Sequence, residues 1–219
     1  MTARLDRQQL RDRLDAGQRE YSDFDFAGAD LSRIDLADTK FANCAIEGAD
    51  LTGTKLNNTV WTRCRAIGAS FKAADGENAA FAGCNLANTD WSGARLASAS
   101  FEDCKLTGGD FRDSKLLGIA FKNVLLVSAM IRDISFRRMT LEGIDFSQAD
   151  LGGADFRECV LNDCRLNGAS LRAARFDGAD LRGCDLGQIT LNDAGIFKGA
   201  TISRSQATEL LHGLGLTVI

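Results

Sequence analysis

Large apolar residues recur at every fifth position along most of the chain. From Phe26 to Ile196, the 35 positions whose numbers end in 1 or 6 hold Leu, Phe, Ile or Trp, except at Ala66 and Gly76. The residue two places earlier is mostly small or β-branched. A period of five fits neither the 3.6-residue period of a helix nor the two-residue period of a strand. It predicts a coil with a corner every five residues, and no insertion shifts this register within the span.

A longer period of 20 residues is superimposed on the period of five. Gly and Asn are frequent two residues after each apolar centre, where a corner needs residues that tolerate positive φ. Four such sides make a square coil of 20 residues, so residues 21–200 hold about nine coils. The cysteines follow this spacing in one column: Cys44, Cys64, Cys84, Cys104, Cys164 and Cys184. The expected fold is therefore an all-β solenoid whose neighbouring coils stabilise one another.

Short helices are predicted at both ends of the repeat. Asp6 and Gln9 fit a capping box that opens a helix, and Gly17 is a plausible stop. Ser203 and Gln206 form a second candidate capping box. We expect residues 1–20 to form a helical cap on the first coil and residues 201–219 to form a C-terminal helix.

The C-terminal segment carries an apolar face whose spacing fits one side of a helix. Two interpretations remain open: the face caps a monomer, or it joins two copies as a dimer interface. The residues concerned are Ala207, Leu210, Leu211 and Leu214, followed by Leu216 and Val218.

Composition narrows the classes of function. The formal net charge of −4 argues against direct binding of nucleic acid, and no window approaches the roughly 18 apolar residues of a membrane span. No secretory signal precedes the seven cysteines, so we expect a soluble cytoplasmic protein with reduced, buried thiols rather than a metal site. His212 is the single histidine, and the glycines follow the corner rhythm rather than a phosphate-binding motif. We therefore expect neither an enzyme nor a cofactor.

Acidic residues form a column on one side of the predicted coil. Ser70 and Met130 interrupt it, and Asp35, Asp75 and Asp155 make a partial second column. One interpretation is that aspartate serves as a turn hydrogen-bonder, and the other is that the column binds a partner. Residues 21–200 carry 25 acidic and 20 basic side chains, so a negative surface is confined to one or two faces. The column consists of Asp30, Asp50, Asp90, Asp110 and Asp150.

Two further features could contact a partner. Leu117, Leu125, Val127 and Met130 fall at outward positions, where a cluster would mark a protein interface. The small centres Ala66 and Gly76 either leave a packing irregularity or form a bulge that contacts a partner.

The tandem A(D/N)LXX pattern resembles the pentapeptide repeat family, which implies a right-handed quadrilateral parallel β-helix. The C-terminal residues resemble those of the Qnr and mycobacterial fluoroquinolone-resistance group. In that group the tail builds a homodimer, and the protein binds DNA gyrase or topoisomerase IV as a mimic of duplex DNA. The unbroken register is more similar to the loop-free members. The matching residues are Ile202, Gln206, Leu210, Leu211, Leu214, Gly215, Leu216 and Val218.

The resemblance implies a protein that protects a type II topoisomerase from quinolones or from a gyrase-targeting toxin. The alternative is a non-catalytic scaffold or adaptor that binds another protein through the apolar patch around Leu125.

Overall fold

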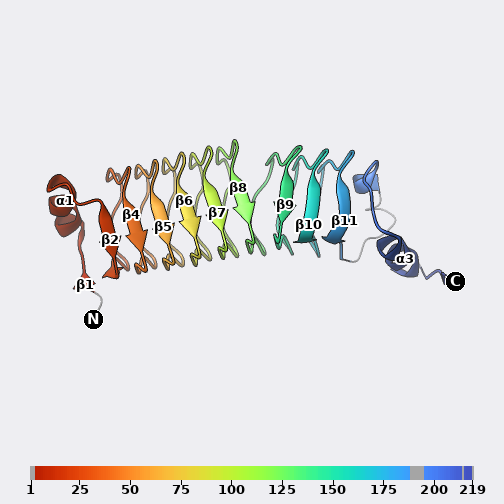
Figure 1. The fold of residues 1–219 in the computed structure, drawn as a ribbon, viewed down its shortest axis with the longest axis horizontal. Coiled ribbons are helices and arrows are strands. Elements are labelled where there is room, and N and C mark those ends of the chain that lie inside the picture. Colours follow the sequence, from red (N-terminus) through yellow and green to blue (C-terminus); the bar gives the residue numbers. More distant parts are fainter. Residues whose placement is uncertain (1–2, 188–194, 214, 219) are drawn as a thin grey trace. The chain divides into compact units, whose positions relative to one another are not determined.

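The computed structural model describes residues 3–187, 195–213 and 215–218. The chain divides into two compact units, residues 1–125 and residues 126–219. In both units short parallel strands stack one coil above the next (Figure 1).

The first unit is a parallel β-helix closed at its beginning by a helix. Its main strands pair in parallel in the order β2, β4, β5, β6, β7 and β8, with each partner 20 residues further along, as Tyr21 opposite Phe41. This confirms the predicted period. The elements are β1 (Ala3–Arg4), α1 (Arg7–Asp15), β2 (Glu20–Ser22), β3 (Phe24–Asp25), β4 (Lys40–Ala42), β5 (Val60–Thr62), β6 (Ala80–Ala82), β7 (Ser100–Glu102) and β8 (Ala120–Lys122).

The corners explain the five-residue rhythm. Two residues after a centre the backbone turns with positive φ, as at Gly28 (66°) and Asn58 (57°). Glycine adopts this conformation without steric strain, and asparagine tolerates it better than most residues. Between corners, the backbone amides bond to the next coil: the amide of Phe26 donates to the carbonyl of Ala45 at 2.7 Å. The coil sides thus satisfy their peptide groups against their neighbours.

Stacked side chains fill the interior of the first unit. Phe41 and Trp61 lie with ring centroids 4.2 Å apart, and Phe71 and Trp91 with centroids 4.1 Å apart, both in nearly parallel planes. A third column is made of cysteine thiols, in which Sγ of Cys64 lies 3.5 Å from the carbonyl oxygen of Phe41. These side chains are all buried, so the inward columns predicted from the sequence are confirmed.

The coil with two small centres keeps the regular backbone. Ala66 and Gly76 are both buried, and their amides bond to the next coil at 2.8 and 2.7 Å. A Cβ at Gly76 would lie 2.9 Å from Cδ2 of Leu96, so that leucine already occupies the space of the missing side chain. Of the two alternatives, a bulge is therefore absent at these two described positions, and packing by neighbours compensates for the small centres.

Helix α1 covers the first coil of its unit, as predicted. Asp6 and Gln9 form the capping box through two hydrogen bonds of 2.9 Å. Leu10 is fully buried, and the amide of Leu5 donates to the carbonyl of Asp25 at 2.9 Å. The helix thereby removes the first coil's apolar face from water.

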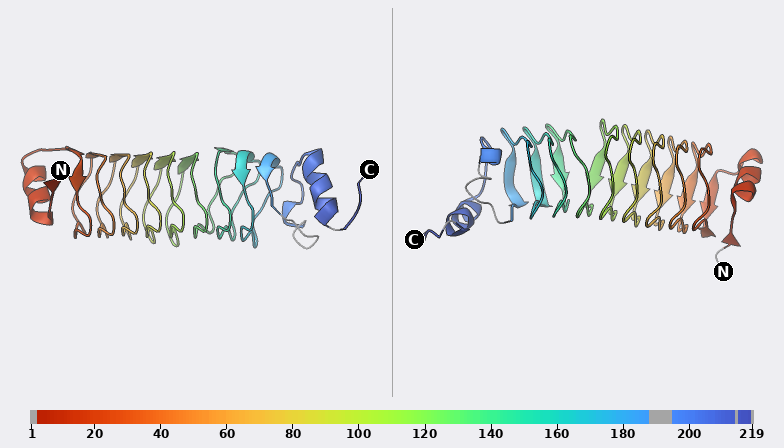
Figure 2. Two further views of the ribbon diagram at one scale, coloured as in Figure 1. Left: turned by 90° about the horizontal axis from the view of Figure 1, so that it is seen from below. Right: turned by 180° about the vertical axis from the view of Figure 1, so that it is seen from behind.

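The second unit is built of the same type of coil (Figure 2). Strands β9 and β10 pair in parallel with a 20-residue offset, and β10 pairs with β11. Phe156 and Phe176 stack in its core with ring centroids 4.8 Å apart. The elements are β9 (Thr140–Glu142), β10 (Val160–Arg165), β11 (Asp180–Asp185), the 3-10 helix η1 (Gly195–Phe197) and α3 (Arg204–Gly213).

The register slips by one residue at the end of the second unit, which corrects the prediction of an unbroken repeat to Ile196. Phe197 packs against Phe176 with ring centroids 4.9 Å apart, an offset of 21 residues, and Asp180 pairs with Thr201 at the same offset. Ile196 is only half-buried. The repeat centre Leu191 lies outside the described residues.

The cysteines face inward in both units. All seven are buried and unpaired by disulfides. Burial raises the pKa of Cys159 to about 12 and of Cys164 to about 11, because an apolar surrounding disfavours the thiolate. Within the described residues, neither helix has the length and apolar character needed to cross a membrane.

Candidate partner-binding surfaces

The predicted aspartate column exists in the first unit. Asp30 pairs with Asp50 in parallel, and Asp90 pairs with Asp110, with Ser70 between the two pairs. Neighbouring positions in the column are one strand spacing apart, about 4.8 Å. The first unit therefore presents four carboxylates in line on one side of its coils.

Each of these carboxylates also holds its own turn. Oδ1 of Asp50 accepts a hydrogen bond from the amide of Thr52 at 2.8 Å, and Oδ1 of Asp90 accepts one from the amide of Ser92 at 2.8 Å. Such bonds to a backbone amide two residues on favour aspartate or asparagine at a turn. The structural role predicted for the column is thus real, and it uses one oxygen of each carboxylate.

Basic side chains neutralise part of the column. Arg7 lies 2.9 Å from Asp30, and Arg112 clamps Asp110 through Nε and Nη2. Hydrogen bonds from Ser32 lower the pKa of Asp30, and the Arg112 guanidinium lowers the pKa of Asp110.

Two carboxylates of the column remain unpaired. Among the described residues, no cation lies within ion-pair distance of Asp50 or Asp90. Asp50 is exposed and Asp90 is half-exposed. These two aspartates make no ion pair, although Arg112 lies close enough to Asp90 to interact with it electrostatically.

The partial second column is a ladder of alternating charge. Lys55 lies 2.9 Å from Asp35, and Arg95 pairs with Asp75. A hydrogen bond from the Lys55 ammonium lowers the pKa of Asp35. Burial alone would raise the pKa of Asp75, but hydrogen bonds from Arg95 and Asn57 outweigh it, so the pKa of Asp75 is also lowered. The 20-residue spacing of these acids and bases was visible in the sequence, although their pairing was not predicted. This side offers little free negative charge.

In the second unit, Asp150 is the member of the predicted acidic column. It pairs with Met130 and Ser170, and its carboxylate lies 3.5 Å from Arg132. Its Oδ1 also accepts a hydrogen bond from the amide of Gly152. Asp150 is therefore a single, partly neutralised charge within its unit.

Two leucines of the proposed apolar patch lie on different sides of the first unit's coil. Within the first unit, the carbonyl of Leu117 accepts from Ser98, while Leu125 pairs with Lys105, two sides away around the square coil. Each side of the coil holds five consecutive residues, so two residues that are eight positions apart in the sequence lie on different sides. Leu117 is 83% exposed and Leu125 is 42% exposed. Val127 and Met130, both half-exposed, belong to the second unit.

A side chain of the C-terminal helix, Gln206, hydrogen-bonds the helix to the last coil. Nε2 of Gln206 donates to the carbonyls of Leu181 and Cys184 at 2.7 and 2.6 Å. Ser203 and Gln206 also form the predicted capping box. The rest of α3 buries no residue completely among those described.

The predicted dimer face is thus left largely open. Leu211 is 38% exposed, Leu216 is 53% exposed and Val218 is 40% exposed. Ala207 and Leu210 are half-buried, and Leu214 lies outside the described residues. An apolar face of this kind leaves room for a second protein chain.

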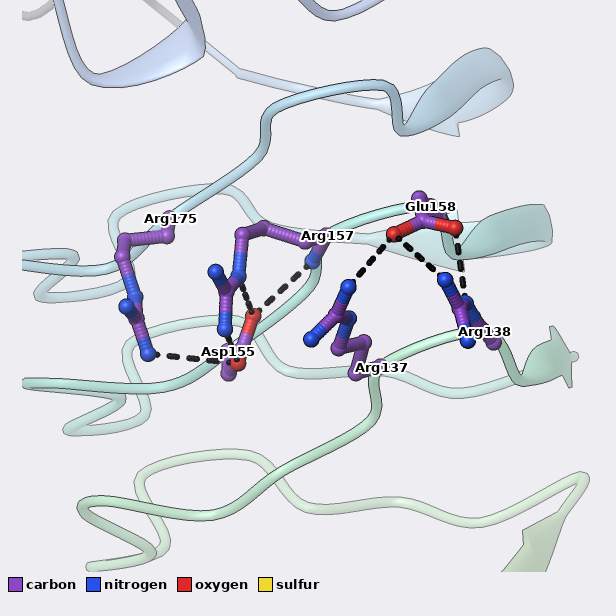
Figure 3. A network of polar contacts seen from close by, with 6 residues as sticks. All are labelled: Arg137, Arg138, Asp155, Arg157, Glu158 and Arg175. Carbon is purple, nitrogen blue, oxygen red and sulfur yellow. Dashed lines mark hydrogen bonds and ion pairs between the residues drawn. The ribbon is translucent and has the colours of Figure 1, made fainter.

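A network of arginines and carboxylates lies on one side of the second unit and was not predicted (Figure 3). Asp155 accepts hydrogen bonds from Arg157 at 2.8 and 2.6 Å and from Arg175 at 3.2 Å. Glu158 accepts from Arg137 at 2.8 Å and from Arg138 at 2.7 Å.

The arginines hold both carboxylates ionised. They lower the pKa of Asp155 to about 2 and the pKa of Glu158 to about 2. The sequence showed an excess of arginine in this half of the chain, but it did not show which carboxylates hold those arginines.

The geometry defines the protein class as a parallel β-helix of five-residue sides. The chain belongs to the pentapeptide repeat family. The family's sequence model for a pentapeptide repeat region matches residues 74–150, and the model for pentapeptide repeats in eight copies matches residues 22–58, 44–75 and 149–188. No curated protein matches the sequence.

Solved structures share the fold at low sequence identity. A trypsin-treated variant of QnrB1, a plasmid-mediated fluoroquinolone resistance protein, aligns with a TM-score of 0.79 and 22% identity over 91% of this chain and 98% of that one. Full-length QnrB1 aligns with a TM-score of 0.75 and 21% identity over 90% and 97% of the two chains. HetL is a pentapeptide repeat protein involved in heterocyst differentiation regulation in the cyanobacterium Nostoc sp. strain PCC 7120. It aligns with a TM-score of 0.57 and 20% identity over 90% of this chain and 94% of that one.

Proposed function

We propose that this chain is a Qnr-like protein that binds a type II topoisomerase, DNA gyrase or topoisomerase IV, in place of duplex DNA. In this role it protects the enzyme from quinolones or from a gyrase-targeting toxin. The observation that carries the proposal is the pair of carboxylates without an ion pair, Asp50 and Asp90, in a regular column on the first unit. The fold similarity to QnrB1 supports the same assignment.

The mechanism is competition for a basic DNA-binding surface. Duplex DNA presents one negative charge per ~1.7 Å of its axis. The first unit carries 18 acidic and 16 basic residues, so it attracts such a surface only through its locally acidic side. Asp50 and Asp90 are the first contacts under this proposal, and the carboxylates paired with Arg7 and Arg112 are weaker ones.

The protein acts as a cytoplasmic homodimer in this proposal. The exposed residues Leu211, Leu216 and Val218 form the contact between two copies at the C-terminus. The buried thiols suit a reducing compartment, where structural disulfides are rare.

The decisive experiment is a supercoiling assay with purified gyrase, with and without a quinolone. The wild-type protein is compared with the double variant Asp50→Asn, Asp90→Asn. Asparagine keeps the Oδ1 acceptor for the turn amide, so the change removes charge and preserves the fold. The matched control is Glu20→Gln, Asp35→Asn, which removes two exposed but ion-paired charges.

Competition with DNA is supported if the Asp50→Asn, Asp90→Asn variant loses gyrase inhibition and drug rescue while the control variant keeps both. Equal activity of all three proteins rejects the acidic side as the contact, and no effect of the wild type on gyrase rejects the function.

A second candidate is an adaptor that binds another protein through an exposed leucine. The observation that favours it is the 83% exposure of Leu117, which leaves a large apolar side chain available to a partner. The test uses Leu117→Asp and Leu125→Asp variants that fold normally. The adaptor is favoured if these variants retain full activity on gyrase but no longer bind a different partner protein.

A further inference from the structure

The arginine network on the second unit is built from two separate clusters. Arg157 and Arg175 hold Asp155, while Arg137 and Arg138 hold Glu158. Each cluster has two cations for one anion. This composition leaves unneutralised positive charge on a surface whose side chains are already fixed in place.

Two guanidiniums of these clusters belong to neighbouring coils. Arg137 and Arg157 occupy the same column, 20 residues apart, and the amide of Arg138 donates to the carbonyl of Arg157 at 3.0 Å. Figure 3 shows the Arg137 guanidinium between Arg157 and Glu158. Within the part of the chain that the structure describes, no carboxylate is hydrogen-bonded to both Arg137 and Arg157.

These guanidiniums keep donors available for an incoming anion. Arg157 uses Nε and Nη2 on Asp155, and Arg137 uses Nη2 on Glu158. Their remaining N–H groups make no hydrogen bond to the described protein. A planar guanidinium can donate two parallel hydrogen bonds to a carboxylate, so the pair is suited to receive one.

The setting favours an acidic protein segment over nucleic acid. The side carries four arginines against Asp155, Glu158 and the neighbouring Asp177, a surplus of one positive charge. Residues 126–219 as a whole hold 12 acidic and 10 basic residues, a net charge of −2. A polyanion such as DNA needs many basic contacts and is repelled by that net charge, whereas one or two carboxylates need only the local pair.

We propose that Arg137 and Arg157 form a binding site for a carboxylate of an acidic segment in a partner protein. The two internal carboxylates hold the guanidiniums in position before binding, so little side-chain freedom is lost when the partner arrives. The site is independent of the acidic column on the first unit and opposite to it in charge.

The test is fluorescence anisotropy with a labelled hexaglutamate peptide at low salt. The wild type is compared with Arg137→Gln, which leaves Glu158 its second partner Arg138. The matched control is Arg182→Gln, because Arg182 clamps Asp180 in the same bidentate manner as Arg157 clamps Asp155, but on another side. Thermal melting verifies that both variants fold, and a labelled hexaglutamine peptide and a short DNA duplex serve as further probes.

Saturable hexaglutamate binding that weakens roughly tenfold in Arg137→Gln and is unchanged in Arg182→Gln supports the site. The proposed site is overturned by any of three results. These are no hexaglutamate binding by the wild type up to about 1 mM, an equal loss of affinity in both variants, or tighter binding of the DNA duplex than of the peptide. The assay contains no topoisomerase, so its outcome is separate from that of the supercoiling test.

Discussion

The guanidinium of Arg7 lies 2.9 Å from Oδ1 of Asp30 and also donates to the carbonyl oxygen of Asp30. A residue of the N-terminal helix therefore neutralises the first carboxylate of the acidic column. The same arginine helps to fix α1 on the coil, through a third hydrogen bond to the carbonyl of Ser32. The Arg7 side chain thus helps to close the first coil and also covers one charge of the candidate surface.

Arg7→Gln should increase inhibition of gyrase if the acidic column binds the enzyme. The substitution leaves Asp30 unpaired and adds a third free carboxylate beside Asp50. We expect a gain of about twofold, because exposed ion pairs contribute little individually. The concentration for half-inhibition of supercoiling measures it, with the exposed arginine variant Arg63→Gln as control. A weaker Arg7→Gln protein with an intact fold would contradict the role of the column.

Gly76→Leu should destabilise the first unit although it restores the five-residue pattern. A Cβ at this position would already lie 2.9 Å from Leu96, so a larger side chain overpacks the core and costs about 2 kcal/mol. Leu96→Ala should cost about 3 kcal/mol through the cavity that it leaves. Urea unfolding of the double variant should show a loss smaller than the sum, because the new leucine fills the cavity. Strict additivity would show that the two side chains do not share this space.

Acid should weaken the second unit through Asp155. Its folded pKa of about 2 lies below the unfolded value, so the carboxylate stabilises the fold above about pH 4, and this contribution is lost as the pH falls towards 2. Allowing for solvent screening, we expect about 1 kcal/mol. Unfolding of the wild type and of Asp155→Asn between pH 2 and 7 measures the difference, which should shrink towards low pH. A constant difference would exclude this linkage.

Leu211→Asp should convert a dimer into a monomer if the open face of α3 joins two copies. Leu211 is 38% exposed, so a charge costs little in the free chain and much in an apolar interface. Light scattering with size-exclusion chromatography measures the mass. The control His212→Asp changes an exposed neighbour of the same helix. A wild-type monomer at all concentrations would reject the C-terminal dimer.

The coil could be predicted well from the sequence, because every coil places the same types of residue at equivalent inward and corner positions. A centre such as Phe81 has the same inward position as Phe101, so a period in the sequence becomes a column in space. The helix starts at Asp6 and Ser203 were equally predictable, since a capping box is a local motif.

Features were less predictable where two neighbouring residues of similar chemistry could each occupy the same inward position. Ile196 and Phe197 are adjacent and both apolar, and only the three-dimensional packing shows that Phe197 occupies the column above Phe176. The charge of the acidic column was overestimated because Arg7, which neutralises Asp30, comes from outside the repeat. The arrangement of the apolar residues was also hard to predict, since Leu117 and Leu125 are close in sequence but two sides apart around the coil.

The 20-residue offset between coils has a consequence for how such proteins change in length. Removing or duplicating one whole block within the first unit, for example residues 46–65, would return every later residue to an equivalent side. A deletion of any other size would rotate the downstream faces or place polar side chains inside. Gain and loss of whole blocks is therefore an evolutionary route by which the number of free aspartates on one side can vary without a new fold.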